Sequence, residues 1–237
     1  ANPTCMQGCP VSINIPSFIK NIERGEFLAA AKVLKQTSAL PAVCGRVCPQ
    51  EKQCESQCMH IKMGKQPVAI GYLERFAADY ERESGNIAVP EIAAKNGKKV
   101  AVVGSGPAGL SFAGDMAKLG YDVTVFERDD RPGGLLMYGV PNIKLPKDLL
   151  MEKINDLQAR GVKFVLGWEL NAPEDFDKLQ KDFAAVVLCV GSRKEKNLPG
   201  IEVDNKQIFH AKDFLTEVTK DMLNGTEHAN LKGKDVV

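Results

Sequence analysis

Residues 99–109 read Lys-Val-Ala-Val-Val-Gly-Ser-Gly-Pro-Ala-Gly, and this stretch decides the fold. Its first five residues are typical of a buried strand, and its glycines open a helix that we predict from Pro107 to Leu119. A second strand is expected from Asp122 to Phe126. A strand, a helix and a strand in this order form a βαβ unit, which predicts an α/β fold with a parallel sheet.

The glycines of this stretch form the pattern G-x-G-x-x-G, which after a strand and before a helix indicates dinucleotide binding. Gly104 allows a tight turn, Gly106 lets the backbone approach a pyrophosphate, and Gly109 allows the helix to pack closely on the strand. Pro107 and Ala108 begin the helix, whose unpaired N–H groups would face the phosphates. A tight turn without a ligand is the alternative interpretation.

An acidic residue supports the dinucleotide hypothesis. Glu127 follows the second strand, where a carboxylate can accept a hydrogen bond from an adenosine ribose hydroxyl and so disfavours NADP at this site. These residues alone leave both flavin and nicotinamide open.

Apolar periodicity predicts further elements after the βαβ unit. We expect a helix over 146–160, a strand over 162–166, a central strand over 184–190, an amphipathic helix over 211–223 and the start of another strand at 235–237.

The first ninety residues have a different pattern, with no strand alternation before residue 97. Their apolar positions predict two helices between residues 16 and 35 and one helix over 70–83. Cysteine-bearing loops are expected at 5–9 and 44–58. This region therefore reads as a helical module, joined to the sheet by a linker over 86–97.

Composition excludes several partner classes. The chain has 237 residues, 44% of them hydrophobic, and its 31 basic and 30 acidic side chains give a formal net charge of +1. Such a balance supplies no field for nucleic acid or an anionic membrane. No apolar run approaches the length of a membrane span, and the first residues do not resemble a secretory signal. We therefore expect a cytoplasmic protein.

Seven cysteines are distributed unevenly, and six fall in the first quarter of the chain: Cys5, Cys9, Cys44, Cys48, Cys54 and Cys58. Their three-residue spacings do not match the two-residue loops of most structural zinc ribbons. Thiolates beside proline and short loops suit iron–sulfur clusters, whereas disulfides need an oxidising compartment that the sequence does not indicate. The spacing favours clusters over zinc, with disulfides third.

The combined motifs closely resemble the small subunit of NADPH-dependent glutamate synthase, over nearly all of the chain. The resemblance extends to the N-terminal region of dihydropyrimidine dehydrogenase and to the large subunit of ferredoxin-NADP transhydrogenase. Residues 134–145 look most like the glutamate synthase branch. The resemblance implies an N-terminal all-α iron–sulfur module followed by an incomplete Rossmann-like FAD-binding domain.

In that family the helical module carries two [4Fe-4S] clusters. The matching motifs imply that Cys9, Cys48 and Cys54 bind one cluster, together with a fourth ligand from the following helix. Glu74 falls at that place, although without the resemblance a solvated helix carboxylate would be the preferred interpretation. Cys44 is a further candidate ligand.

Cys5 and Cys58 match two ligands of the other cluster, whose remaining pair precedes the equivalent of Ala1 in the family. In the family an inserted NADPH-binding domain follows the equivalent of residues 235–237. We therefore expect a fragment truncated at both ends. Its expected parts are a cluster-binding module (1–90), the first half of the FAD domain (97–202) and a connection to an NADPH domain (203–237).

The resemblance also adds flavin contacts. The pair Gly133-Gly134 with Leu135, directly after the acid, would let the chain pass close to the flavin diphosphate. Gly191 belongs to a second short glycine motif, and Lys144 could approach the flavin or its phosphates, although a solvated lysine is the plain alternative.

The function that the resemblance implies is electron transfer between NADPH, FAD and [4Fe-4S] clusters, without a side chain as catalyst. The electrons would serve glutamate synthesis from 2-oxoglutarate and glutamine on a large catalytic subunit. The alternatives are the same front end in pyrimidine reduction or in transhydrogenation with a ferredoxin-type acceptor, and a non-catalytic docking fragment.

Overall fold

The glycine-rich stretch follows an inner strand of a parallel sheet in the computed structural model, which describes residues 3–87, 90–192, 199–200 and 208–226. β1 (Lys99–Val103) pairs with β2 (Asp122–Glu127) and with β4 (Ala185–Leu188), and β2 pairs with β3 (Lys163–Leu166). The order β3-β2-β1-β4 confirms the predicted parallel α/β fold and brings the carboxyl ends of β1 and β2 together.

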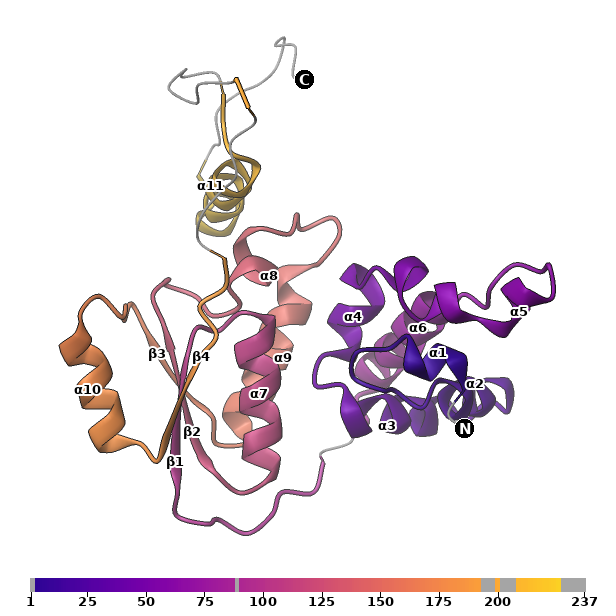
Figure 1. The fold of residues 1–237 in the computed structure, drawn as a ribbon, viewed down its shortest axis with the longest axis horizontal. Helices are drawn as coiled ribbons and strands as arrows, with labels where there is room; N and C mark the ends of the chain where they lie inside the picture. Colours follow the sequence, from indigo (N-terminus) through magenta and orange to yellow (C-terminus); the bar gives the residue numbers. More distant parts are fainter. Residues whose placement is uncertain (1–2, 88–89, 193–198, 201–207, 227–237) are drawn as a thin grey trace.

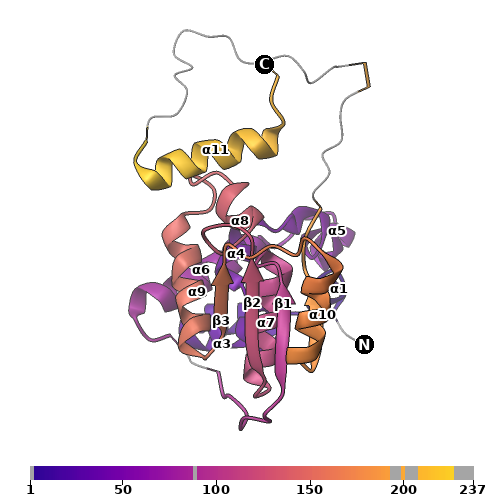
Figure 2. The same ribbon diagram turned by 90° about the vertical axis from the view of Figure 1, so that its left-hand side faces the viewer.

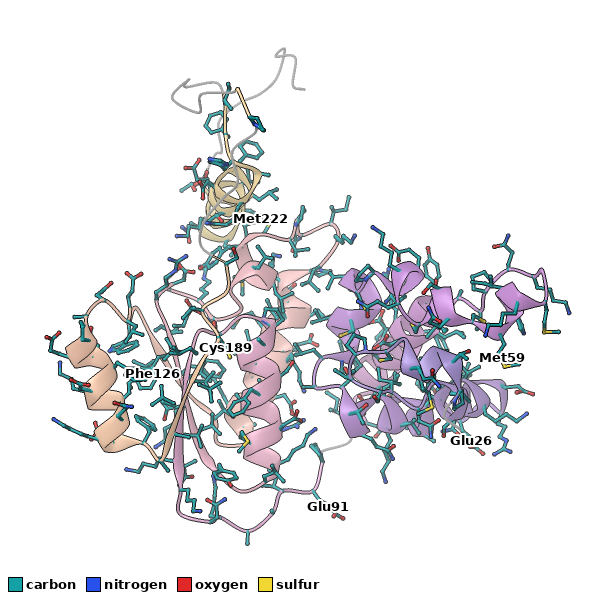
Figure 3. All side chains as sticks on the ribbon, in the orientation of Figure 1. Glu26, Met59, Glu91, Phe126, Cys189 and Met222 are labelled. Atoms are coloured by element: carbon teal, nitrogen blue, oxygen red, sulfur yellow. The ribbon has the colours of Figure 1, made fainter. Side chains whose placement is uncertain are left out.

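Helices cover both faces of the sheet (Figures 1 and 2). α7 (Pro107–Lys118) and α9 (Lys147–Ala159) cover one face, and α10 (Pro173–Asp182) covers the other. Side chains alternate between the faces, because Val102 belongs to the core under α7 and α9 while Ala101 and Val103 pack with Leu179 of α10. Figure 3 shows Phe126 on the α10 side as well.

One expectation for this part differs from the structure, and one helix was missed. The strand expected to be central, β4, is the edge strand of the described sheet, and its residues are half-buried or exposed. Its apolar run is typical of a strand covered on both sides, but within the described residues it pairs only with β1. Helix α10 was not predicted, because Leu179 is its one buried residue and its other positions are mainly charged.

The N-terminal module is helical, as predicted. Its helices are α1 (Thr4–Gln7), α2 (Ile15–Glu23), α3 (Phe27–Thr37), α4 (Pro41–Val47), α5 (Met59–Lys62) and α6 (Ile70–Ser84), with 3-10 turns η1 (Gln50–Lys52) and η2 (Glu55–Gln57). Phe18, Leu34 and Ala77 centre its core. The cysteine segments are not simple loops, since Cys5 lies on α1 and Cys44 on α4. Helical structure fixes the spacing of these cysteines.

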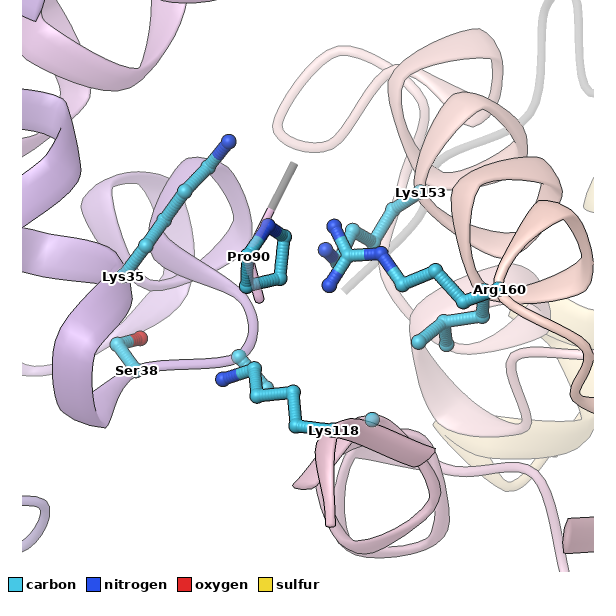
Figure 4. Close-up of a pocket in the computed structure, with 9 residues that line it drawn as sticks. Lys35, Ser38, Pro90, Lys118, Lys153 and Arg160 are labelled. Carbon is cyan, nitrogen blue, oxygen red and sulfur yellow. The ribbon is translucent and has the colours of Figure 1, made fainter. Parts of the chain in front are cut away.

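The module and the sheet domain share a core. Leu40 and Val43, at the start of α4, belong to the same buried apolar cluster as Leu149 of α9. Beside this contact, a small pocket is lined by cationic side chains from α3, α7, α9 and the residue directly after α9: Lys35, Lys118, Lys153 and Arg160 (Figure 4). Carboxylates compensate these cations; Asp156, for example, lies 2.8 Å from Lys153 Nζ and 2.6 Å from Arg160 Nη2. The junction between the module and the sheet domain therefore has an apolar interior, and the cations at its edge are paired with carboxylates.

A last helix lies at the carboxyl edge of the sheet. α11 (Ala211–Asn224) packs against α8 (Leu135–Tyr138), where the Thr219 hydroxyl donates to the carbonyl oxygen of Tyr138 at 3.4 Å. The strand expected at 235–237, and residues 203–207 of the expected connection, lie outside the described residues. Among the helices that the structure describes, none has both the length and the apolar character needed to span a bilayer.

Candidate dinucleotide and iron–sulfur sites

The three fingerprint glycines have different roles in the turn between β1 and α7. Gly104 has a φ of +101°, and a Cβ there would lie 2.3 Å from the carbonyl oxygen of Cys189. A Cβ on Gly109 would lie 2.0 Å from the carbonyl oxygen of Gly104. These two glycines are thus required by the fold itself. Gly106 differs, because a Cβ there would meet no atom within 4 Å.

The space beside Gly106 is bordered by a second backbone segment. Gly134 has a φ of +52°, and a Cβ on it would lie 3.0 Å from the Cα of Gly106. The start of α7, with Pro107 in its first turn, lies directly after Gly106. A helix N-terminus and two closely approaching glycine backbones form a cradle that fits a pyrophosphate.

Glu127 lies beside this cradle and is bound to it. Its Oε2 accepts hydrogen bonds from the backbone N–H of Ser105 at 2.9 Å and from the Ser105 hydroxyl. Its Oε1 accepts one from the backbone N–H of Asp129 at 3.0 Å. A carboxylate offers about four acceptor positions, so one position is left for an added hydroxyl donor. The carboxylate can therefore orient the turn and receive a ribose hydroxyl together.

Ser105 is a site residue that the sequence did not reveal. It is fully buried, and its Oγ accepts a hydrogen bond from the backbone N–H of Gly133 at 2.8 Å while donating to Glu127. One hydroxyl thereby joins the glycine turn, the end of β2 and the Gly133-Gly134 segment. As a residue between two glycines it gave no signal, because its role depends on contacts with distant segments.

The remaining expected flavin residues surround the cradle more loosely. Leu135 and Lys144 are exposed, and Gly191 has a φ of +67° with no atom within 4 Å of a Cβ. All three have free space for a ligand contact, and no protein partner fixes the Lys144 side chain among the contacts of the described residues.

A different lysine, Lys147, fixes the segment after α8. It is only 4% exposed, and its Nζ donates to the carbonyl oxygens of Leu136 at 2.9 Å and Val140 at 2.5 Å. Burial lowers the pKa of this ammonium to about 8. From sequence it reads as a solvated lysine at the start of a helix, so nothing pointed to its burial.

The cysteines expected to share a cluster lie near one another, but their side chains are not arranged as a metal-binding site. Burial, with smaller contributions from the charges of Cys9, Glu55 and Cys48, raises the pKa of the Cys54 thiol to about 12. In the described ranges, however, no three His, Cys, Asp or Glu side chains are grouped so that they could hold a metal ion as they stand. Metal ligands commonly reach their final geometry only when the metal binds.

Glu74 fits a ligand role on two observations. The residue is 5% exposed, and its buried Oε1 has no hydrogen-bond partner among the described residues. Burial raises the pKa of this carboxyl group to about 7, and its charge in turn raises the pKa of both Cys44 and Cys48. A buried carboxylate without a partner is unfavourable unless a cation or cluster binds it, and here it faces thiols.

The backbone between these groups is closely packed. A Cβ on Gly45 would lie 2.7 Å from both N and Cα of Arg75, so α4 and α6 are in backbone contact next to Glu74. Glu55 accepts a hydrogen bond from the N–H of Gly71 at 3.0 Å, which caps the start of α6. The segment that carries Cys54 is thereby tied to the helix that carries Glu74.

The other two expected ligands, Cys5 and Cys58, are also brought together. The Thr4 hydroxyl donates to the carbonyl oxygen of Gln57 at 2.6 Å, joining the residues that precede the two cysteines. Burial is the main cause that raises the pKa of Cys5, and the charge of Cys58 contributes. The seventh cysteine, Cys189, lies after β4 beside α7, away from this module (Figure 3).

Comparisons with known proteins agree with both halves of the chain. Residues 1–86 match the family model described as dihydropyrimidine dehydrogenase domain II, 4Fe-4S cluster, and residues 102–144 match the NAD(P)-binding Rossmann-like domain. The expected order of an iron–sulfur domain and a Rossmann-like domain is thereby confirmed.

Similar curated proteins extend over nearly the whole chain. The glutamate synthase [NADPH] small chain of Bacillus subtilis is 40% identical over 97% of this chain and 47% of its own length. That of Azospirillum brasilense is 34% identical over 99% of this chain and 50% of its own length. The NAD-dependent dihydropyrimidine dehydrogenase subunit PreT of Escherichia coli is 36% identical over 89% of this chain and 50% of its own length. The chain thus spans about half the length of these relatives.

Proposed function

We propose that this chain, a homologue of glutamate synthase small chains and of PreT subunits over nearly its whole length, is the iron–sulfur and flavin-binding part of an electron-transferring oxidoreductase. The iron–sulfur part is supported by the family match of residues 1–86. The single observation that carries the proposal is the buried carboxylate of Glu74, which has an unpartnered oxygen and whose charge raises the pKa of Cys44, on α4, and of Cys48, directly after α4.

For the cluster, we assign Cys9, Cys48, Cys54 and Glu74 to one [4Fe-4S] site, with Cys44 as a neighbouring thiol. Because burial raises the pKa of Cys44 and of Cys54 to about 12, these two thiols stay protonated at neutral pH without a metal, and cluster binding would release protons. Cys5 and Cys58 contribute to a second site.

For the flavin, we assign FAD to the cradle of Gly106 and Gly134, with Glu127 on the adenosine ribose. Bound FAD would accept two electrons together and release them singly to iron–sulfur clusters. The protein's own residues bind and orient the dinucleotide: the α7 N-terminus faces the pyrophosphate, and Ser105 holds the carboxylate of Glu127 in place. The remaining residues proposed to surround the bound FAD are Pro107, Ala108, Gly109, Gly133, Leu135, Lys144 and Gly191.

For the reaction, we propose that NADPH supplies the electrons from a further domain and that they serve glutamate synthesis on a large catalytic subunit in the cytoplasm. The division into 1–90, 97–202 and 203–237 is part of this proposal. The similarity to PreT subunits, at nearly the same identity, favours pyrimidine reduction as the second candidate.

Replacing Glu74 with leucine tests the proposal. Leucine fills a similar volume but has no oxygen that could bind iron, so the variant should contain less iron than the wild type after anaerobic reconstitution. The metal-free variant should also unfold at higher temperature than the wild type, because the unpartnered carboxylate is gone. Wild-type iron content in this variant would contradict the assignment, and zinc in place of iron would contradict the cluster. A chain that binds neither iron nor FAD would support a docking role only.

A further inference from the structure

An ion pair connects the two helices that carry candidate cluster ligands. Arg46 lies on α4 between Cys44 and Cys48, and its Nη2 lies 2.8 Å from Oδ2 of Asp79 on α6. The side chains are 6% and 20% exposed, so Arg46 is not the surface arginine that its sequence context allows. Its Nη1 also donates to the carbonyl oxygen of Ala42 at 3.1 Å, which fixes the guanidinium against its own helix.

The charge of Asp79 is compensated mainly by Arg46. It lies on the same helix as Glu74, and its Oδ1 is buried without a hydrogen-bond partner. Arg75 is the second cation nearby, with Nε 3.6 Å from Oδ2, but its side chain is half exposed. The buried guanidinium of Arg46 is therefore the main compensation of the Asp79 charge. Removing either member alone would leave a buried charge between α4 and α6.

We propose that Arg46 and Asp79 form a charge-compensated clamp that positions Cys44 of α4, and Cys48 directly after it, against Glu74 of α6. Asp79 at the same time cancels the positive charge that Arg46 would otherwise present to a cluster. Both are positioning residues, and the inference rests on the proposed iron–sulfur site. Close packing at Gly45 brings the helices together, and the ion pair fixes their register.

The test compares Arg46→Met, Asp79→Asn and the double variant with the wild-type chain. In the metal-free chain, each single variant should lower the folding equilibrium constant roughly tenfold or more, and the double variant should lose less than the product of the two. After reconstitution, Asp79→Asn should raise the reduction potential of the cluster and Arg46→Met should lower it. The double variant should return the potential toward the wild-type value, since local net charge sets it.

The exposed pair of Lys20 and Glu23, 2.9 Å apart on α2, is the matched control. Lys20→Met and Glu23→Gln should change neither stability nor potential. If the double variant of Arg46 and Asp79 lowered the folding equilibrium constant by the full product of the two single effects, the clamp would be overturned whether or not iron binds. Potential shifts of the same sign in both single variants would overturn the charge compensation. A wild-type chain that takes up no iron would instead count against the proposed function.

Discussion

The backbone N–H of Ser105 donates a hydrogen bond to the carboxylate of Glu127 at 2.9 Å, and the Ser105 hydroxyl binds the same oxygen. This contact joins the glycine turn after β1 to the end of β2. With the N–H of Gly133 bound to the same hydroxyl, the order of the whole cradle depends on one buried serine.

Ser105→Ala should therefore destabilise the chain by about 1–3 kcal/mol, because it leaves the buried N–H of Gly133 without its acceptor. Urea denaturation measures this loss. Ser56→Ala, which removes an exposed hydroxyl bonded to Gln53, should cost less than about 0.5 kcal/mol. Equal stability of the two variants would contradict the role of Ser105.

Gly106→Ala and Gly109→Ala should differ in kind. A Cβ on Gly106 meets no protein atom within 4 Å, so that variant should fold normally but bind FAD at least tenfold more weakly, a loss of about 1.4 kcal/mol. A Cβ on Gly109 would contact the carbonyl oxygen of Gly104, so that variant should be destabilised. Thermal unfolding and flavin fluorescence titration separate the effects. Full FAD affinity in Gly106→Ala would reject the cradle.

Gly45→Ala should separate the two ligand-bearing helices. The added Cβ would lie 2.7 Å from backbone atoms of Arg75, which cannot move as a flexible side chain could. We expect a destabilisation of about 1–3 kcal/mol and a reduced iron content after reconstitution. Lys32→Ala, at an exposed position of α3, should be within about 0.5 kcal/mol of wild type. Unchanged stability and iron in Gly45→Ala would show that this close contact is dispensable.

Lys147 should make stability depend on pH in the alkaline range. Its pKa is about 8 in the folded chain, below the value of 10.5 for an ordinary lysine, so between these values the unfolded chain binds more protons. The contribution of Lys147 to stability should therefore rise with pH across this window, whereas the buried thiols of Cys44 and Cys54, whose pKa values are raised to about 12, make stability fall with pH above the ordinary thiol pKa. Lys147→Met should lack this rise, whereas Lys144→Met, at an exposed lysine, should keep it. Identical pH profiles for wild type and Lys147→Met would contradict the buried ammonium.

Local sequence signals predicted much of the fold. Apolar runs and glycine punctuation were sufficient for β1, α7 and β2. The two helices predicted between residues 16 and 35 are α2 and α3, and Gly25, with a φ of +76°, lies between them. Helix α10 escaped prediction because it buries only Leu179, and the edge position of β4 escaped because pairing is a property of the whole sheet. Short-range sequence patterns therefore predict where helices and strands form better than they predict which strands pair in the sheet.

The candidate site was predictable where residue type alone carries the chemistry. The fingerprint glycines and the cysteines stand out by spacing, and their roles remain proposals. Ser105, Lys147 and Asp79 could not be found in this way, because each acts through a partner from a distant segment. The burial that gives Glu74 its unpartnered oxygen is likewise a tertiary property, and only resemblance singled it out beforehand.

The central claim is that Cys9, Cys48 and Cys54 share one inorganic centre with Glu74. Anaerobic iron and sulfide analysis of single cysteine-to-serine variants tests it most directly. Loss of Cys9, Cys48 or Cys54 should lower iron and sulfide by the same amount, corresponding to one [4Fe-4S] cluster, while Cys189→Ser should retain the wild-type content. Unequal losses among the three variants, or a loss in Cys189→Ser as large as theirs, would contradict the shared cluster.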